Sequence, residues 1–331
     1  MERFVFVAAV TIAIIIGVFA AFGGHWGRHF SFNIDGVEAH GMAPVVALQP
    51  GHLQPQTFAG NDLRLRYLAA NVTITPEDRS DFSIEIDNGA GRAPTPTVTV
   101  EHGRVIVDGQ LRGRIGGCDN GGASLRGYDD ITADQMPRII IHAPRDLTVE
   151  RDGAGTTEIA ASQALNLDVS GCGPVTIGDV TEDLSLDLAG SGDVQAGAAH
   201  KLDADIAGSG NVTVGAVAEG AELDMAGAGS VEMASLHGDL TTNGAGAGNL
   251  RIHGGAIDEA NIDLAGAGDV DIAAPVQTLK VSIVGAGNVD VTAAVHDVEA
   301  DIAGVGSVHV QSLTGSLHKE VFGPGDVRVG Q

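Results

Sequence analysis

The residues in this chain that could do chemistry are aspartates that recur about every 19 positions. They are Asp168, Asp187, Asp205, Asp224, Asp263 and Asp301. A row of carboxylates could hold a divalent cation, because hard oxygen ligands suit calcium. It could also supply the acid and base of a glycan-cleaving enzyme, or it could be a solvated polar face without chemistry. The choice depends on the elements that bring the aspartates together.

A repeat positions these aspartates. Its signature is Gly-x-Gly followed by a small polar residue and an aliphatic one, and each aspartate lies three residues before the first glycine. The clear copies begin at Gly190, Gly208, Gly227, Gly246, Gly266, Gly285, Gly304 and Gly323, with a further copy at Gly171 and a degenerate one at Gly153. Apolar and polar residues alternate on both sides of the glycines, as in Leu184–Leu188. Alternation with a period of two predicts two short strands per unit, each with one face inward.

The paired glycines predict a sharp corner between the two strands, because positive φ values cost glycine little. We therefore assign a structural role to Gly190, Gly192, Gly208, Gly210, Gly227, Gly229, Gly266 and Gly268. One tight corner and one variable corner per unit favour a coil over antiparallel hairpins. Each coil would stack its strands in parallel on the coil before, about 4.8 Å apart. The predicted fold is all-β, a right-handed parallel β-helix, in which equivalent side chains form columns.

The rest of the chain divides into three predicted segments. Residues 4–22 are apolar and uncharged, so 1–24 are predicted to be a signal peptide or a membrane anchor. Residues 25–58 have the composition of a linker. Residues 59–146 alternate like strands without the glycine signature, and we expect irregular coils there that cap the regular repeats of 147–331.

Composition and charge narrow the range of partners. Aromatic residues make up 4% of the chain, which predicts a thin core of aliphatic side chains. The formal net charge is −25, and residues 147–331 carry 6 basic and 27 acidic side chains, a net of −21. Such a surface repels nucleic acid and anionic lipid headgroups. We expect no nucleic-acid partner, and membrane contact only through an uncleaved N-terminal segment.

The two cysteines, Cys118 and Cys172, are candidates for one disulfide in an oxidising compartment. The bridge would tie the glycine-rich loop at 116–121 to a corner at the start of the repeats. The other interpretation is two unrelated thiols.

The repeated units resemble those of a known family. Leu188-Ala189-Gly190-Ser191-Gly192-Asp193-Val194 and its copies are similar to the head GIN domain proteins, a bacterial envelope family also called autotransporter adhesins. The resemblance covers roughly 58–331. It implies a right-handed parallel β-helix behind an export signal, and it supplies no catalytic residues that could be transferred.

The sequence contains no specific motif for calcium binding or for glycan cleavage. Calcium-binding β-rolls repeat Gly-Gly-x-Gly-x-Asp, whereas here a single turn per coil places an acidic residue directly after the second glycine, as at Asp193. An enzyme would need one singular carboxylate pair, and the row offers many equivalent carboxylates. We assign no catalytic residue and no firm metal site, and calcium is the one cofactor considered.

The sequence predicts an exported envelope protein that is not an enzyme. It would present a rigid acidic β-helix for binding, adhesion or scaffolding towards a cell-surface polymer or an envelope protein, in the periplasm or at the cell surface. Two alternatives stay open, a glycan-cleaving β-helix enzyme that uses paired aspartates and a calcium-stabilised structural module. End-to-end self-association is also open.

Overall fold

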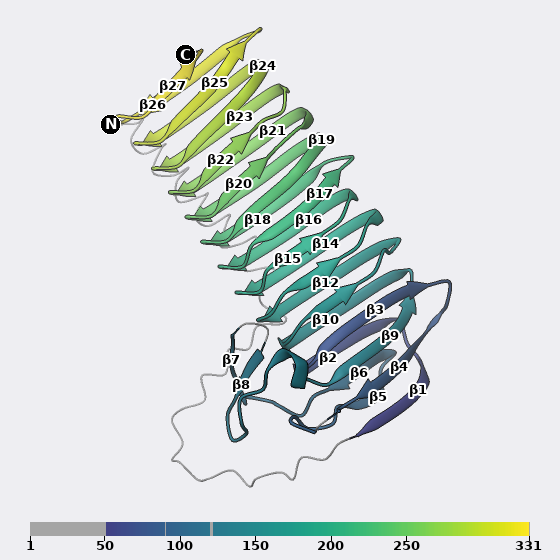
Figure 1. Cartoon of the computed structure of the whole chain (residues 1–331). Helices are drawn as coiled ribbons and strands as arrows, with labels where there is room; N and C mark the ends of the chain where they lie inside the picture. Colours follow the sequence, from purple (N-terminus) through teal and green to yellow (C-terminus); the bar gives the residue numbers. More distant parts are fainter. Residues whose placement is uncertain (1–50, 90, 120–121, 331) are drawn as a thin grey trace. The chain divides into compact units, whose positions relative to one another are not determined.

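The computed structural model describes residues 51–89, 91–119 and 122–330, and these form strands and one short 3₁₀ helix (Figure 1). The predicted signal peptide or anchor, residues 1–24, lies outside the described residues. Among those that are described, no helix is long and apolar enough to cross a membrane.

The irregular first part of the described chain contains nine strands and the 3₁₀ helix η1. They are β1 (His52–Ala59), β2 (Asp62–Ala69), β3 (Asn71–Glu77), β4 (Asp81–Asp87), β5 (Thr97–Glu101), β6 (Arg104–Asp108), β7 (Ile115–Asp119), β8 (Gly122–Leu125), η1 (Ala133–Gln135) and β9 (Arg138–Pro144). Strand β1 takes up residues 52–58 at the end of the segment predicted as a linker.

The regular part contains eighteen strands. They are β10 (Asp146–Ala154), β11 (Thr157–Ile159), β12 (Ala164–Gly171), β13 (Val175–Ile177), β14 (Val180–Gly190), β15 (Val194–Ala196), β16 (Ala199–Gly208), β17 (Val212–Val217), β18 (Ala221–Gly227), β19 (Ser230–Gly246), β20 (Asn249–Ile252), β21 (Gly255–Gly266), β22 (Asp269–Ile272), β23 (Val276–Gly285), β24 (Asn288–Gly304), β25 (Ser307–Leu313), β26 (Leu317–Phe322) and β27 (Asp326–Val329).

Each regular coil has one strand before its glycine corner and one after it. Strands on the same side of the corner pair in parallel from coil to coil, as β14 does with β16 and β15 with β17. The register keeps the repeat in phase, so that Gly190 pairs with Gly208. The long strands β19 and β24 continue through the looser corner without a break. The predicted solenoid of parallel coils is confirmed, and its right-handed winding stays a prediction.

The core of the regular coils is one narrow strip of aliphatic side chains. Successive coils fill one inward column with Leu186, Ala204 and Leu223, all buried. The next member of that column is Thr242, which is fully buried and whose hydroxyl has no hydrogen-bond partner among the described residues. Because burying a hydroxyl without a hydrogen bond costs free energy, we expect Thr242 to stabilise the fold less than the aliphatic members of the column do.

The two glycines of a corner are required for different reasons. Gly208 has a φ of +144°, which side chains with a Cβ rarely adopt, and a Cβ there would also overlap the carbonyl oxygen of Gly190. Gly210 does not have a positive φ, yet a Cβ at Gly210 would overlap the carbonyl oxygen of Gly192 in the coil before. In this corner positive φ and close approach both require the first glycine, and close approach alone explains the second.

Two irregular coils extend the stack at the end where the regular coils begin, next to β10 and β11. Strands β2 and β3 pair in parallel with β10 and β11. On their far side β2 pairs with β6, and β3 with β9, again in parallel. Antiparallel strands follow, with β5 on β6, β4 on β9, and β1 on β4. The order of these coils in the stack therefore differs from their order in the chain.

The insertion between β6 and β9 builds a second, smaller core. Its hairpin, β7 paired with β8 in antiparallel fashion, forms a separate sheet. Apolar residues of the insertion pack with residues from the first coils, and together they are Ala69, Ala93, Leu111, Ala123, Leu125, Ile131, Met136 and Ala154. The hairpin is thus a packed part of the molecule.

Candidate functional site

The structure brings the predicted aspartates into one column on the outer face of the coils. Asp168 pairs with Asp187, Asp187 with Asp205, and Asp205 with Asp224. Asn243 and Ser282 then alternate with Asp263 and Asp301 in the same column. The Nδ2 of Asn243 donates to the Oδ1 of Asp224 at 2.7 Å, so the amide relieves the carboxylate repulsion at that step.

The column begins one coil earlier than the sequence reasoning placed it. Glu150 pairs with Asp168, and on its other side Glu150 pairs with Arg64. The Arg64 guanidinium lies 2.7 Å from the Glu150 carboxylate, and the Arg104 guanidinium lies 3.4 Å from it. Glu150 stands three residues before the degenerate corner at Gly153, so the repeat offset would have found it. Nothing in the sequence pairs it with the two arginines.

Burial and repulsion raise the pKa of several carboxyl groups in this column. Burial, followed by repulsion from Asp187 and Glu150, raises the pKa of Asp168 to about 6. Burial also raises the pKa of Asp263 and of Asp301, and repulsion from Glu320 adds to the shift at Asp301. The charged forms of these groups are therefore less favourable in the folded protein.

The column offers no ligand cluster for a metal. Among residues 51–89, 91–118 and 122–330, no three His, Cys, Asp or Glu side chains converge well enough to hold an ion. Each coil contributes at most one carboxylate to the column, whereas calcium takes six to eight oxygen ligands. Stabilisation by calcium stays a prediction, and so does catalysis by paired aspartates. The positions of the side chains add no support to either.

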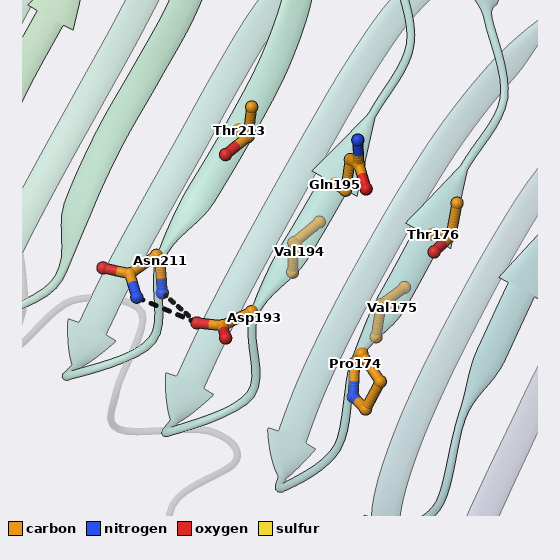
Figure 2. Close-up of a pocket in the computed structure, with 8 residues that line it drawn as sticks. All are labelled: Pro174, Val175, Thr176, Asp193, Val194, Gln195, Asn211 and Thr213. Atoms are coloured by element: carbon orange, nitrogen blue, oxygen red, sulfur yellow. Dashed lines mark hydrogen bonds between the residues drawn. The ribbon is translucent and has the colours of Figure 1, made fainter. Parts of the chain in front are cut away.

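A groove lies on the neighbouring face, across strands β13, β15 and β17 (Figure 2). Its volume is about 350 Å³, and it is lined by Pro174, Val175, Thr176, Asp193, Val194, Gln195, Asn211 and Thr213. At its edge the backbone N–H and the Nδ2 of Asn211 both donate to the Oδ1 of Asp193, each at 3.0 Å. This bond links the corners of two successive coils and fixes both side chains.

The groove interrupts a column of charged side chains. Farther along the stack, the outward position of Gln195 and Thr213 is taken by Arg251, whose guanidinium lies 2.8 Å from Asp271, and then by Asp290, which bonds His309 at 3.1 Å. Over the groove the column is Thr176, Gln195 and Thr213 instead.

The side chains of Thr176, Gln195 and Thr213 bond no other described residue, so their donors and acceptors face solvent. Sequence reasoning missed this groove, although the run of uncharged residues at one repeat offset was its signal.

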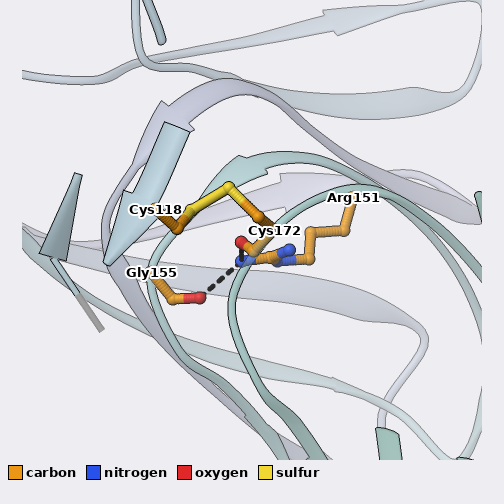
Figure 3. The surroundings of a disulfide bond; sticks show 4 residues. All are labelled: Cys118, Arg151, Gly155 and Cys172. Carbon is orange, nitrogen blue, oxygen red and sulfur yellow. Dashed lines mark hydrogen bonds between the residues drawn. A yellow bond between two sulfur atoms is a disulfide. The ribbon is translucent and has the colours of Figure 1, made fainter. Parts of the chain in front are cut away.

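Cys118 of β7 and Cys172 at the corner between β12 and β13 form a disulfide (Figure 3). Beside it Arg151, which is 3% exposed, occupies an inward position otherwise held by Leu65 and Val169. Its guanidinium donates to the carbonyl oxygen of Gly155 at 2.5 Å and to that of Cys172 at 3.3 Å. Burial lowers the pKa of Arg151 to about 10. The hairpin is thus held to the solenoid covalently, next to a buried cation.

Comparison with known proteins gives one family. Residues 143–216 and 186–294 match the model of the family described as "Putative auto-transporter adhesin, head GIN domain". The matched residues contain the carboxylate column from Glu150 to Asp263 and the whole groove. The curated proteins include no match.

Several solved structures resemble the chain. A protein of Parabacteroides distasonis described as a putative lipid binding protein covers 86% of this chain and 96% of its own, at 16% identity and a TM-score of 0.43. A putative adhesin of Bacteroides fragilis covers 87% and 100%, at 17% identity and a TM-score of 0.39. At identities and TM-scores this low, the similarity says nothing of what this chain binds.

Proposed function

We propose that this chain, whose coils over residues 143–294 belong to the head GIN domain family, is an exported envelope protein that binds an uncharged glycan in its solenoid groove. It would act as a binding or adhesion surface and carry out no catalysis. The observation that carries the proposal is the groove on β13, β15 and β17, where hydrogen-bonding side chains without charge interrupt a charged column.

The chemistry of the groove fits hydroxyl groups. Gln195 offers both a donor and an acceptor, and the hydroxyls of Thr176 and Thr213 offer both as well. The Oδ2 of Asp193 accepts no hydrogen bond from the described residues, while Oδ1 is held by Asn211, so a fixed carboxylate oxygen faces the ligand. A neutral polyhydroxyl chain could donate to the Asp193 carboxylate and exchange hydrogen bonds with the other groups, and it brings no charge of its own that would be buried without a partner.

The surrounding charge argues against anionic ligands. Residues 147–331 carry a net charge of −21, so a polyuronate would be repelled from the face that holds the groove. The volume of about 350 Å³ lies near the lower end for small-molecule sites, which suits a short stretch of a polymer. Parallel strands about 4.8 Å apart also repeat their side chains at a spacing close to that of sugars in an extended glycan.

Binding to neutral oligosaccharides tests the proposal. Titration calorimetry of the full chain with cellohexaose, laminarihexaose and mannohexaose is expected to show binding to at least one, and none to hexagalacturonate. Gln195→Ala is expected to weaken that binding about tenfold, because two hydrogen bonds to the ligand are lost. The matched control is Gln277→Ala on β23, an exposed glutamine outside the groove, which should leave the affinity within twofold.

Capture of envelope polymers by the immobilised chain tests the location of the binding site separately from the binding role. If immobilised full chain captures envelope polymers and Gln195→Ala captures them equally well, the groove is not the site, although the binding role stands. If the chain captures nothing from envelope extract and binds none of the oligosaccharides, the binding role itself is wrong. Release of reducing ends from a bound oligosaccharide would overturn the non-catalytic part of the proposal.

A further inference from the structure

Three arginines lie close together along the backbone at the base of the β7–β8 hairpin, and we call Arg112, Arg114 and Arg126 the arginine triad. Ile115 of β7 pairs with Leu125 of β8, and the residues next to this pair are Arg114 and Arg126. The backbone N–H of Arg126 donates to the carbonyl oxygen of Arg114 at 2.7 Å, so the two arginines stand opposite each other. Arg112 precedes Arg114 by two residues, across a turn at Gly113.

Aromatic rings hold two members of the triad. The Arg112 guanidinium carbon lies 5.8 Å from the centre of the Tyr67 ring, and that of Arg114 lies 5.4 Å from the centre of the Tyr128 ring. Both tyrosines pack against the second core, which also contains Leu125. A guanidinium over a ring face keeps its N–H groups directed outward in the plane, so these arginines are ordered before any ligand arrives.

The triad forms no ion pair among the described side chains. No carboxylate of 51–89, 91–118 or 122–330 forms an ion pair with Arg112, Arg114 or Arg126, whereas Arg66, which lies over the same Tyr67 ring as Arg112, bonds Asp108 at 2.8 Å. The absence is notable in a chain with a net charge of −25. Like charges directly opposite each other across a strand pair are destabilising, so the arrangement carries a cost that a bound anion would offset.

We propose that the arginine triad binds a phosphate monoester group. A phosphate monoester carries a charge of about −1.5 to −2 at neutral pH and presents three strong acceptor oxygens. Three guanidinium groups carried by neighbouring backbone positions would supply donors for three oxygens and balance that charge, whereas one carboxylate presents two oxygens and a single charge. Guanidinium also forms two parallel hydrogen bonds to phosphate, which an ammonium group cannot do.

The hairpin is a rigid base for such a site. The disulfide from Cys118 fixes β7 to the corner at Cys172, and the buried side chains of Leu125 and Ala123 fix β8 in the second core. The site lies on the insertion between β6 and β9, while the groove lies on β13, β15 and β17, so it is a second site and does not depend on the function proposed above. A free phosphate ion and a phosphate on a sugar share the recognised chemistry.

Calorimetry with matched sugars tests this site. The full chain is titrated in phosphate-free buffer at fixed ionic strength with inorganic phosphate, glucose 6-phosphate, glucuronate and glucose. Glucose 6-phosphate is expected to bind at least tenfold more tightly than glucuronate, and glucose is expected not to bind. Inorganic phosphate binding as tightly as glucose 6-phosphate indicates a site for the phosphate alone, and weaker binding of inorganic phosphate indicates that the sugar contributes. Both results support the proposal.

Three variants locate the site. Arg114→Gln and Arg126→Gln are each expected to weaken glucose 6-phosphate binding at least tenfold, and Arg126→Lys less than that. Arg138→Gln, which removes an exposed arginine from β9, is the matched control and should stay within twofold. In phosphate-free buffer Arg126→Gln is expected to melt at a higher temperature than the unaltered chain, because the repulsion from Arg114 is gone, and this result also shows that the variant folds.

Three results would overturn the proposal. They are equal affinity for glucuronate and glucose 6-phosphate, an equal loss of affinity in Arg138→Gln, and no binding of any phosphate by the unaltered chain.

Discussion

The regular coils and the irregular first coils both stack their strands in parallel, but different features of the chain hold the two stacks together. In the regular coils each corner is made by two glycines, and equivalent residues pair from coil to coil, as Gly190 does with Gly208. In the first coils strands still stack in parallel, but Tyr67, with a φ of +52°, lies where the register of β2 shifts against β10. Antiparallel strands, a hairpin and a disulfide replace the repeated corners there.

The difference shows what a repeat provides and what it leaves out. Because equivalent corners pair from coil to coil, each regular coil stacks on the one before it without a cross-link between them, and the disulfide joins a regular corner only to the hairpin. The first coil of a stack has no template and leaves an open sheet edge. The chain covers that edge with segments that follow no repeat, and it is there that unpaired arginines and a cross-link occur.

The largest expected effect comes from breaking a regular corner. Gly208→Val introduces a β-branched residue at a φ of +144° and overlaps the carbonyl oxygen of Gly190. We expect a loss of more than about 4 kcal/mol in the free energy of unfolding, measured by urea denaturation. The control is Gly117→Ala on β7, where a Cβ meets nothing within 4 Å. Equal effects at the two sites would contradict the role given to stacked corners.

The next effect belongs to the cap. Replacing both Cys118 and Cys172 by serine removes a cross-link between residues 54 positions apart. We expect the free energy of unfolding to fall by about 2–4 kcal/mol, since the unfolded chain regains loop entropy. Reductant should destabilise the unaltered chain equally and leave the double variant unchanged. A melting curve that is indifferent to the disulfide would mean that packing alone holds the hairpin.

A smaller effect tests the carboxylate column through pH. Because the pKa of Asp168 is raised from 3.8 to about 6, the folded state binds its proton more tightly than the unfolded state does. Stability should therefore fall as pH rises from about 4 to about 6, and the loss is complete above that range. Asp168→Asn is expected to raise stability at pH 7 by about 1–2 kcal/mol, allowing for solvent screening, and to flatten the pH profile.

Asp203→Asn, which removes an exposed carboxylate from an adjacent column, is the control and should change stability at pH 7 by less than about 0.5 kcal/mol. A steeper pH profile in Asp168→Asn would contradict the assignment.

The fourth prediction concerns Thr242 in the regular core. Thr242→Val keeps the shape of the side chain and removes a buried hydroxyl that has no partner among the described residues. We expect a gain of about 1 kcal/mol in the free energy of unfolding, since an unsatisfied polar group is lost. Thr241→Val, at the neighbouring position outside the core, should give no comparable gain. Destabilisation by Thr242→Val would show that the hydroxyl is satisfied in solution.

The smallest effect is expected from calcium. No three described acidic or histidine side chains converge on one point, so we expect the melting temperature in millimolar calcium to equal that in chelator at the same ionic strength. A rise of several degrees that Asp187→Asn abolishes would restore the calcium-stabilised module as a hypothesis.

The repeat made the regular coils predictable, and it made the carboxylate column predictable with them. Residues at the same offset from a periodic corner must stack once the coils are parallel. The alignment of Asp168, Asp187 and Asp205 could therefore be predicted from the sequence. The first coils could not be ordered in this way. Strands β2 and β3 stack between two pairs of strands that follow them in the chain, β6 and β9 on one side and β10 and β11 on the other. No local sequence pattern indicates this order.

The sequence by itself determined the period, the parallel coils and the row of carboxylates, because these follow from alternation and from glycine stereochemistry applied once per unit. Tertiary structure alone decided what depends on residues distant in the chain. It placed Arg64 against Glu150, fixed the hairpin at Cys172 and put Arg114 opposite Arg126. The physical reason is that a repeat specifies only contacts between neighbouring units, whereas the closing of an open end depends on packing that no repeat encodes.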